Sequence, residues 1–206
     1  GLGYATAISC AHMGAEVVAL GRHSERLQQT LSDLNQISEL PHSLHVADLT
    51  DAESRKQLVA NLGRPIDGLV HCAGISRLSP VRMMTEHHMR EVQAVNVEAP
   101  MLLTQEILKR NLVSPEGSIV FLASIAAHIG VPGVAMYSGT KAALLAMSRC
   151  LAMEVVKRKI RVNCLSPALV ETPIFDAMIE LSGDASMEQQ RNNYPLGFGK
   201  PEDVAN

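Results

Sequence analysis

The sequence predicts a doubly wound α/β fold, in which helices cover both faces of a parallel sheet in three layers. Short, nearly all-apolar runs alternate with helical patterns along the chain, and such runs are typical of parallel strands buried on both faces. The chain has 206 residues, of which 47% are hydrophobic, enough for one domain with a full core. We therefore expect a single domain spanning residues 1–206.

Each expected element follows from a local pattern in the sequence. Apolar runs predict strands at residues 16–20, 44–47, 66–72, 118–122 and 160–165. Helical spacing of apolar residues predicts helices at residues 4–13, 24–34, 51–62, 86–96, 100–112 and 137–157. Ser24 is expected to cap the second of these helices, and Thr50 or Asp51 the third, because their side chains can accept a hydrogen bond from a helix N-terminus.

Composition argues against several classes of protein. A net charge of −3 gives no indication of a nucleic-acid partner, and no apolar run approaches the length of a membrane span. The four cysteines lack C-x-x-C spacing and the eight histidines show no ligand pattern, so we expect no metal site. We interpret the cysteines as reduced, buried thiols of a cytoplasmic protein.

The segment from Ser124 to Lys141 carries the groups with the clearest chemical meaning. Tyr137 and Lys141 are spaced to share one face of a helix, and Ser124 follows an apolar strand. A nearby ammonium favours the phenolate and is expected to lower the pKa of Tyr137. Such a phenol can exchange a proton with an alcohol or carbonyl oxygen that the serine holds. The alternative is a surface tyrosine and lysine on an ordinary helix, with a serine in a turn.

Other notable residues follow the expected strands. They are Gly21 and Arg22, Asp48, Ala73 and Gly74, Ser124, and Pro167. Because a doubly wound sheet binds its ligands at the carboxyl ends of the strands, this distribution predicts a ligand site at that edge.

With these residues in place, the chain resembles the short-chain dehydrogenase/reductase family, which has a Rossmann fold. The family's T-G-x-x-x-G-x-G turn is represented by Gly1-Leu2-Gly3, and its N-N-A-G by His71-Cys72-Ala73-Gly74, with both asparagines replaced. Residues 167–172 (P-A-L-V-E-T) resemble the family's P-G-x-V-x-T, with alanine for glycine. By this resemblance we expect the family's first strand, and its C-terminal helix and strand, to be missing from residues 1–206.

The resemblance implies a catalytic set of Asn96, Ser124, Tyr137 and Lys141. Tyr137 would donate a proton to a substrate carbonyl while NADPH delivers hydride to its carbon, and Ser124 would orient and polarise the carbonyl oxygen. Lys141 would lower the pKa of Tyr137 and hydrogen-bond the nicotinamide ribose. Asn96 would interrupt a helix and hold a water that links the lysine to solvent.

The resemblance also implies a set of cofactor-binding residues. The pyrophosphate would lie against Gly1, Leu2 and Gly3, where glycine lets the backbone approach a phosphate at a helix N-terminus. Asp48 and Leu49 would contact the adenine. The remaining contacts would come from Ala73, Gly74, Tyr137, Lys141, Pro167, Val170 and Thr172.

Arg22 and His23 bear on the choice of cofactor. An acidic residue just after the second strand would bind a ribose 2′-hydroxyl, whereas an arginine suits a 2′-phosphate. No Asp or Glu occurs in this turn before Glu25. We therefore expect NADP(H) to be preferred over NAD(H); the alternative is a solvent-exposed Arg22 without a ligand.

The substrate is expected to be a small molecule or an acyl thioester. Residues 173–194 would form a lid whose apolar side chains suit an acyl chain, a steroid or another apolar ketone, or else pack on the core: Ile174, Phe175, Met178, Ile179 and Leu181. The segment P-L-G-F-G-K-P-E-D-V-A-N resembles bacterial 3-oxoacyl-[acyl-carrier-protein] reductases. Alternatives are a sugar, polyol or steroid dehydrogenase, a non-catalytic NADP(H)-binding sensor or scaffold, and a chain that binds no ligand because its first strand is missing.

The resemblance further implies a homodimer or homotetramer. Family members associate through two long helices, which here are expected at residues 100–112 and 137–157. An apolar face on the second could contribute, or could belong to the core: Ala143, Met147, Cys150, Leu151 and Met153.

Overall fold

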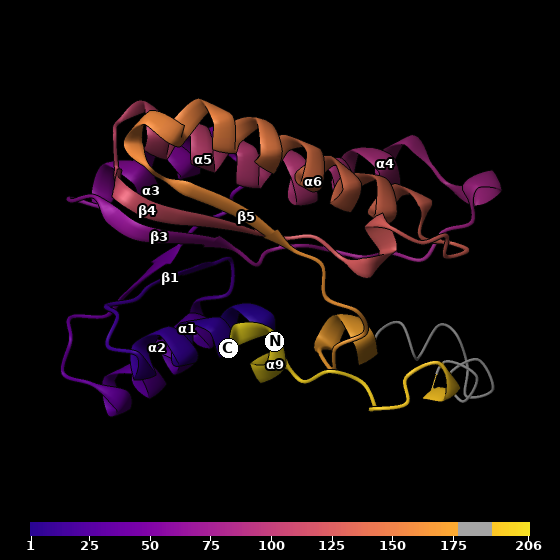
Figure 1. The fold of residues 1–206 in the computed structure, drawn as a ribbon, viewed down its shortest axis with the longest axis horizontal. Helices are drawn as coiled ribbons and strands as arrows, with labels where there is room; N and C mark the ends of the chain where they lie inside the picture. The colour runs from indigo at the N-terminus through magenta and orange to yellow at the C-terminus, as the bar shows by residue number, and fades with distance from the viewer. Residues whose placement is uncertain (177–190) are drawn as a thin grey trace. The chain divides into compact units, whose positions relative to one another are not determined.

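The computed structural model describes residues 1–176 and 191–206 (Figure 1). The chain divides into two compact units, one made of residues 1–47 and 168–206 and the other of residues 48–167. Both units contain parallel strands flanked by helices, which confirms the predicted α/β fold. In the described residues no helix combines the length and the apolar character needed to cross a membrane.

The first unit is built on a pair of parallel strands. Its elements are α1 (Leu2–His12), β1 (Val18–Gly21), α2 (Ser24–Ile37), β2 (Ser43–Val46) and α9 (Pro201–Ala205). Val18 pairs with Ser43 and Gly21 with Val46. Helix α1 packs against α2 and α9, and the Tyr4 hydroxyl donates to Asp33 Oδ2 at 2.9 Å.

The second unit contains three parallel strands in the order β3-β4-β5. Its elements are α3 (Ala52–Asn61), β3 (Ile66–His71), α4 (Glu86–Gln93), α5 (Ala99–Lys109), β4 (Val113–Leu122), α6 (Ala135–Val155) and β5 (Arg161–Leu165). A π-helix, η2 (Ala94–Glu98), joins α4 to α5. The 3-10 helices are η1 (Val81–Met83), η3 (Ile125–Ala127) and η4 (Val156–Arg158). Helices α5 and α6 both lie over one face of this sheet (Figure 1).

Strand β4 and helix α5 supply the core of the second unit. Phe121 and Ile119 on β4, and Leu103 and Ile107 on α5, are at most 2% exposed. Burial of a side chain of this size contributes about 1.5–3 kcal/mol relative to leaving it in water. The sheet is therefore fixed at the strand whose C-terminal end leads to Ser124.

Two local expectations differ from the structure. His23, and not Ser24, is the N-cap of α2: its backbone is extended, and its carbonyl accepts the Leu27 N–H at 3.1 Å. Strand β4 begins at Val113, before the predicted residue 118, because residues 114–117 bulge out between the Ile66–Val113 and Gly68–Ser118 pairs. The predicted cap of α3 is confirmed, since Asp51 Oδ2 accepts the Ser54 N–H at 2.6 Å.

The cysteines are all free, as expected, but their burial was only partly predicted. Cys10, Cys72 and Cys164 are half-buried, whereas Cys150 is exposed. Cys150 is exposed because its side chain lies on the outer face of α6, whereas the neighbouring Leu151 packs in the core.

Candidate active site

Tyr137 and Lys141 lie one turn apart near the start of α6, as their spacing predicts. The Lys141 ammonium is 5.7 Å from the centroid of the Tyr137 ring. Nζ donates to the Leu122 carbonyl at the end of β4, at 2.6 Å, and the lysine is only 5% exposed. The lysine is therefore held between the helix and the end of the central strand.

Ser124 lies two residues after β4 and caps η3, with its Oγ accepting the Ala126 N–H at 3.2 Å. Its neighbours fasten the turn to the segment after β5, because the Ala123 N–H donates to Leu165 O at 2.7 Å and the Ile125 N–H to Pro167 O at 2.8 Å. The Ser124 side chain also acts on the pKa of the Tyr137 phenol, which it lowers. The structure thus brings Ser124, Tyr137 and Pro167 to one end of the sheet.

Asn96 is fully buried in the middle of the π-helix η2. Its Oδ1 accepts the Ile75 N–H at 2.9 Å, and its Nδ2 donates to the Ile75 carbonyl, also at 2.9 Å. Nδ2 donates as well to Thr140 Oγ1 at 3.1 Å. A single amide therefore joins the loop after β3, the α4–α5 segment and α6.

Thr140 is a residue of this site that the sequence did not single out. Its hydroxyl accepts from Asn96 and donates to the Tyr137 carbonyl at 2.7 Å, and it is 1% exposed. The contact with Asn96 joins residues 44 positions apart, so no local pattern could have predicted it. The sequence feature that could have pointed to Thr140 is its position between Tyr137 and Lys141.

Burial dominates the protonation of the two central groups. It raises the pKa of Tyr137 above its usual value, while the hydrogen bond from Ser124 acts in the opposite direction. It also lowers the pKa of Lys141 to about 8. The net direction for Tyr137 is opposite to the sequence-based expectation of a lowered pKa, because desolvation of the phenolate outweighs the stabilising contacts.

Gly74 lies against this cluster, after the end of β3. A Cβ at this position would come within 3.4 Å of both Asn96 Oδ1 and Lys141 Nζ. Glycine at this position therefore avoids crowding both the Asn96 amide and the buried ammonium. Ala73, just before it, is exposed.

Asp48 and Leu49 engage in local contacts at the start of the second unit. Asp48 Oδ1 accepts the Thr50 N–H at 2.9 Å and the Thr50 hydroxyl at 2.7 Å. The Leu49 carbonyl accepts from the buried Arg55 at 2.6 Å. These bonds fix the turn after Ala47, and the Asp48 side chain is exposed.

The first unit holds the remaining predicted residues. Gly1 is the N-cap of α1 and has no side chain to cap it, so Gly1, Leu2 and Gly3 present a helix N-terminus that suits a phosphate. A Cβ on Gly1 would lie 3.8 Å from Pro173 Cδ, which places this turn beside the residue after Thr172. Arg22 and His23 are exposed at the end of β1.

Val170 and Thr172 are ordered by their own neighbours in the first unit. Val170 forms a parallel bridge with Gly199, and Thr172 Oγ1 donates to Val170 O at 3.1 Å. Each unit, taken by itself, offers groups that suit a nicotinamide dinucleotide: the first has a helix N-terminus without a side chain at Gly1, and the second has Gly74 beside the buried Lys141 ammonium.

The expected lid is described only in part. Phe175 is 7% exposed and makes an edge-to-face contact with Phe198 at 4.9 Å, so this side chain packs within the protein, whereas Ile174 is 47% exposed. Met178, Ile179 and Leu181 lie outside the described residues.

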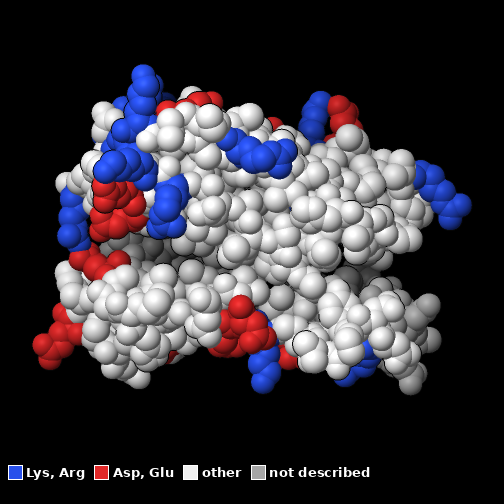
Figure 2. Space-filling model, in the orientation of Figure 1, with Lys and Arg blue, Asp and Glu red and all other residues white. Residues whose placement is uncertain are grey.

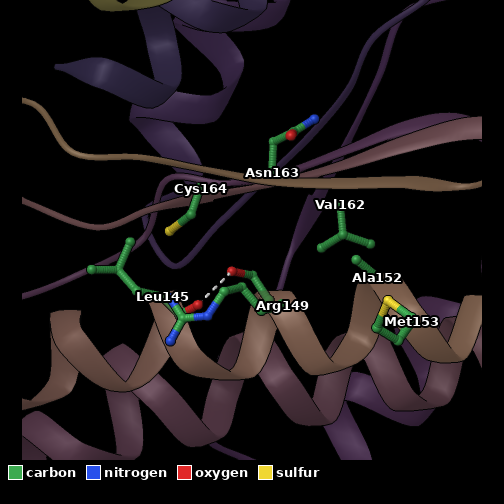
Figure 3. A pocket seen from close by; sticks show the side chains of 8 residues that line it. Leu145, Arg149, Ala152, Met153, Val162, Asn163 and Cys164 are labelled. Carbon is green, nitrogen blue, oxygen red and sulfur yellow. Dashed lines mark hydrogen bonds between the residues drawn. The ribbon is translucent and has the colours of Figure 1, made fainter.

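A hollow of about 500 Å³ lies between α6 and β5, one to four turns along the helix from Lys141 (Figure 3). Val162 and Cys164 point from the strand toward α6, whereas Asn163 points to the other face. Burial raises the pKa of the Cys164 thiol. None of the predicted catalytic residues lines this hollow, but Cys164, which does, interacts electrostatically with Lys141.

The chain is similar in sequence to known reductases and dehydrogenases. The family model described as enoyl-(acyl carrier protein) reductase matches residues 1–206. A 3-oxoacyl-[acyl-carrier-protein] reductase FabG of Thermotoga maritima is 33% identical, with all of this chain and 83% of the relative covered. A 2-keto-3-deoxy-L-fuconate dehydrogenase of Xanthomonas campestris is 30% identical over all of this chain and 68% of the relative.

A solved structure shares the same architecture. The short-chain dehydrogenase/reductase described as a glucose/ribitol dehydrogenase from Brucella melitensis superimposes with a TM-score of 0.90 and is 30% identical. The match covers all of this chain and 82% of that one.

The burial of Lys141 leads to a testable pH dependence of stability. Because its pKa is about 8 in the folded chain and 10.5 as the unperturbed value, the unfolded chain binds more protons between these values. The free energy of unfolding therefore rises with pH by up to about 1.4 kcal/mol per pH unit across that window, as the buried lysine loses its charge. Lys141→Met should be more stable than the unmodified chain at pH 7, and the difference should shrink from pH 8 to 10.5.

Urea denaturation at a series of pH values measures this difference. Lys157→Met, which removes an exposed cation from η4, is the matched control and should shift stability equally throughout the window. A difference for Lys141→Met that stays constant from pH 8 to 10.5 would contradict the assigned burial.

Proposed function

The chain belongs to the short-chain dehydrogenase/reductase family, and from this premise we propose that it interconverts a ketone and a secondary alcohol with NADP(H), reducing a 3-oxoacyl thioester. The observation that carries the proposal is the cluster of Ser124, Tyr137, Lys141 and Asn96 at one end of the three-stranded sheet. A phenol beside a hydroxyl and a buried ammonium is suited to proton transfer at a carbonyl oxygen.

Tyr137 acts as the proton donor in the direction of reduction. Burial raises its pKa, so the phenol carries its proton at neutral pH and can give it to the oxygen that becomes the alcohol. A bound nicotinamide would supply the hydride. The Ser124 hydroxyl, which also acts on the pKa of the phenol, holds the same oxygen and polarises the carbonyl.

Lys141 and Asn96 support the proton transfer. With a pKa of about 8, Lys141 can exchange a proton near neutral pH, and its ammonium lies 5.7 Å from the centroid of the Tyr137 ring. Asn96 holds the water that returns a proton to the lysine, and its own position is fixed by Ile75 and Thr140.

NADP(H) is held by the residues that the family resemblance implies. Gly1, Leu2 and Gly3 take the pyrophosphate at the start of α1, and Arg22 with His23 takes the 2′-phosphate. Asp48 and Leu49 contact the adenine, and Ala73 and Gly74 contact the ribose. The nicotinamide end is bound by Tyr137, Lys141, Pro167, Val170 and Thr172. Both units then belong to one NADP(H)-binding domain.

The acyl-thioester substrate is supported by the relatives named as 3-oxoacyl-[acyl-carrier-protein] reductases, and would make the reaction a step of fatty acid biosynthesis. A second candidate is a sugar dehydrogenase, which the relative named as a 2-keto-3-deoxy-L-fuconate dehydrogenase supports. The two differ in whether the substrate is apolar or rich in hydroxyl groups.

The protein acts as a homodimer or homotetramer through α5 and α6. On α6, Met147 is 38% and Met153 74% exposed, and Cys150 is exposed as well, whereas Leu151 belongs to the core. Figure 2 shows that the surface over α6 is mostly uncharged. Four free thiols suit a cytoplasmic protein.

Removal of the phenol hydroxyl tests the proton donor. Tyr137→Phe should lower kcat by about a hundredfold or more, because general acid catalysis is lost, and should leave the dissociation constant for NADPH within about twofold. Turnover is followed by NADPH absorbance, and cofactor binding by NADPH fluorescence. Ser138→Ala, on the next residue of α6, is the control and should retain activity. Undiminished turnover in Tyr137→Phe would refute the assignment.

Arg22 tests the choice of cofactor. Arg22→Ala should lower kcat/KM for NADPH by about ten- to a hundredfold, because a charge-assisted bond to the 2′-phosphate is worth about 1.5–3 kcal/mol. The value for NADH should change little. Arg26→Ala, an exposed arginine one turn into α2, is the control. An equal fall with both cofactors would contradict a 2′-phosphate contact.

A further inference from the structure

His71 makes a buried contact that the proposed mechanism does not use. It is the last residue of β3, it is 7% exposed, and it stands where the family resemblance predicts an asparagine. Its ring stacks on Phe121 of β4, with centroids 4.7 Å apart and planes 13° apart. Burial lowers its pKa to about 3, so the ring is neutral in the folded protein.

The direction of its hydrogen bond follows from its partner. His71 Nε2 is 2.8 Å from Thr104 Oγ1, and that hydroxyl donates its only proton to the Pro100 carbonyl at 2.8 Å. Thr104 must therefore accept, so Nε2 of His71 carries the proton and donates. The chain His71–Thr104–Pro100 fastens the end of β3 to the first turn of α5.

This bond lies next to the π-helix that carries Asn96. Helix α5 begins directly after η2, where the Ala99 N–H bonds back to Ala94 O, five residues earlier. A π-turn is a rare insertion that has to be held by its surroundings. The end of β3 contacts this helical segment through His71–Thr104, and the loop after β3 contacts it again through Ile75–Asn96.

We propose that His71 is a positioning residue for Asn96: by bonding Thr104 it fixes α5 against the end of β3, and so keeps the π-turn in the register that aims the Asn96 amide at Ile75 and Thr140. Without this bond the first turn of α5 can shift, and Asn96 then leaves the position from which it is proposed to support Lys141. The effect on catalysis rests on the proposed function; the effect on the Ile75–Asn96 bond does not.

Two variants remove the bond while keeping the shape of the core. His71→Phe preserves the stacking on Phe121, and Thr104→Val preserves the volume of the threonine. Both should lower kcat by about tenfold or more with KM within about twofold, since small misplacements of catalytic groups cost this much. Thr104→Ser keeps the hydroxyl and should retain kcat. Ser148→Ala, which removes a buried hydroxyl bonded to Leu145 on α6, is the matched control and should also retain kcat.

A double-mutant cycle separates positioning from general destabilisation. If His71 acts through Asn96, His71→Phe should have little further effect on kcat in an Asn96→Ala background. A fall in kcat of the same size in both backgrounds, or no fall in the unmodified background, would overturn the proposal.

Amide hydrogen exchange gives a readout that does not depend on activity. The Ile75 N–H is bonded to Asn96 Oδ1, and its exchange, followed by NMR, should accelerate about tenfold or more in His71→Phe and Thr104→Val but not in Ser148→Ala. Unchanged exchange in both variants would overturn the proposal. If the unmodified protein reduces no ketone, the proposed function fails, and the exchange rates still decide the role of His71.

Discussion

The buried side-chain amide of Asn96 is the interaction on which the rest of the site depends. A polar group with no exposure to solvent is costly unless its donors and acceptor are satisfied, and Asn96 satisfies them with partners from two other segments. Ile75 extends from β3, and Thr140 lies on α6 between Tyr137 and Lys141. The helix that presents the phenol and the ammonium is thereby tied to the loop that carries Gly74. The π-turn is the local departure from regular structure that this arrangement requires.

Desolvation then sets the chemistry of the groups that this framework holds. Burial moves Tyr137 and Lys141 toward their neutral forms, which raises one pKa and lowers the other. A neutral phenol is a proton donor, and a lysine with a pKa of about 8 can be reprotonated near neutral pH. The proposed reduction of a carbonyl rests on this arrangement, in which Ser124 acts on the pKa of the same phenol.

The alternation of apolar strands and amphipathic helices was sufficient to predict the fold, because both periods are local properties of the chain. The Asp51 cap was predicted for the same reason. The predicted start of β4 was wrong because the bulge at residues 114–117 depends on pairing with β3. The predicted cap of α2 at Ser24 was wrong because its neighbour His23 has the extended backbone of a cap.

In the candidate site, too, local features could be predicted and features that depend on packing could not. Tyr137 and Lys141 could be paired from spacing, but the pKa of Tyr137 depends on burial that only the packed structure reveals. Thr140 and His71 were missed because their partners lie 44 and 33 positions away.

The most direct test of the account is the oxidation of NADPH by the purified protein, followed by absorbance with a 3-oxoacyl thioester and, in parallel, with sugar, polyol and steroid ketones, each repeated with NADH. The account predicts rapid oxidation of NADPH by the 3-oxoacyl thioester and much slower oxidation of NADH. Rapid oxidation with a sugar ketone instead would move the substrate to the second candidate and leave the roles of Ser124, Tyr137 and Lys141 in place. Binding of NADPH without oxidation by any ketone would contradict the central claim and identify the protein as a non-catalytic sensor or scaffold.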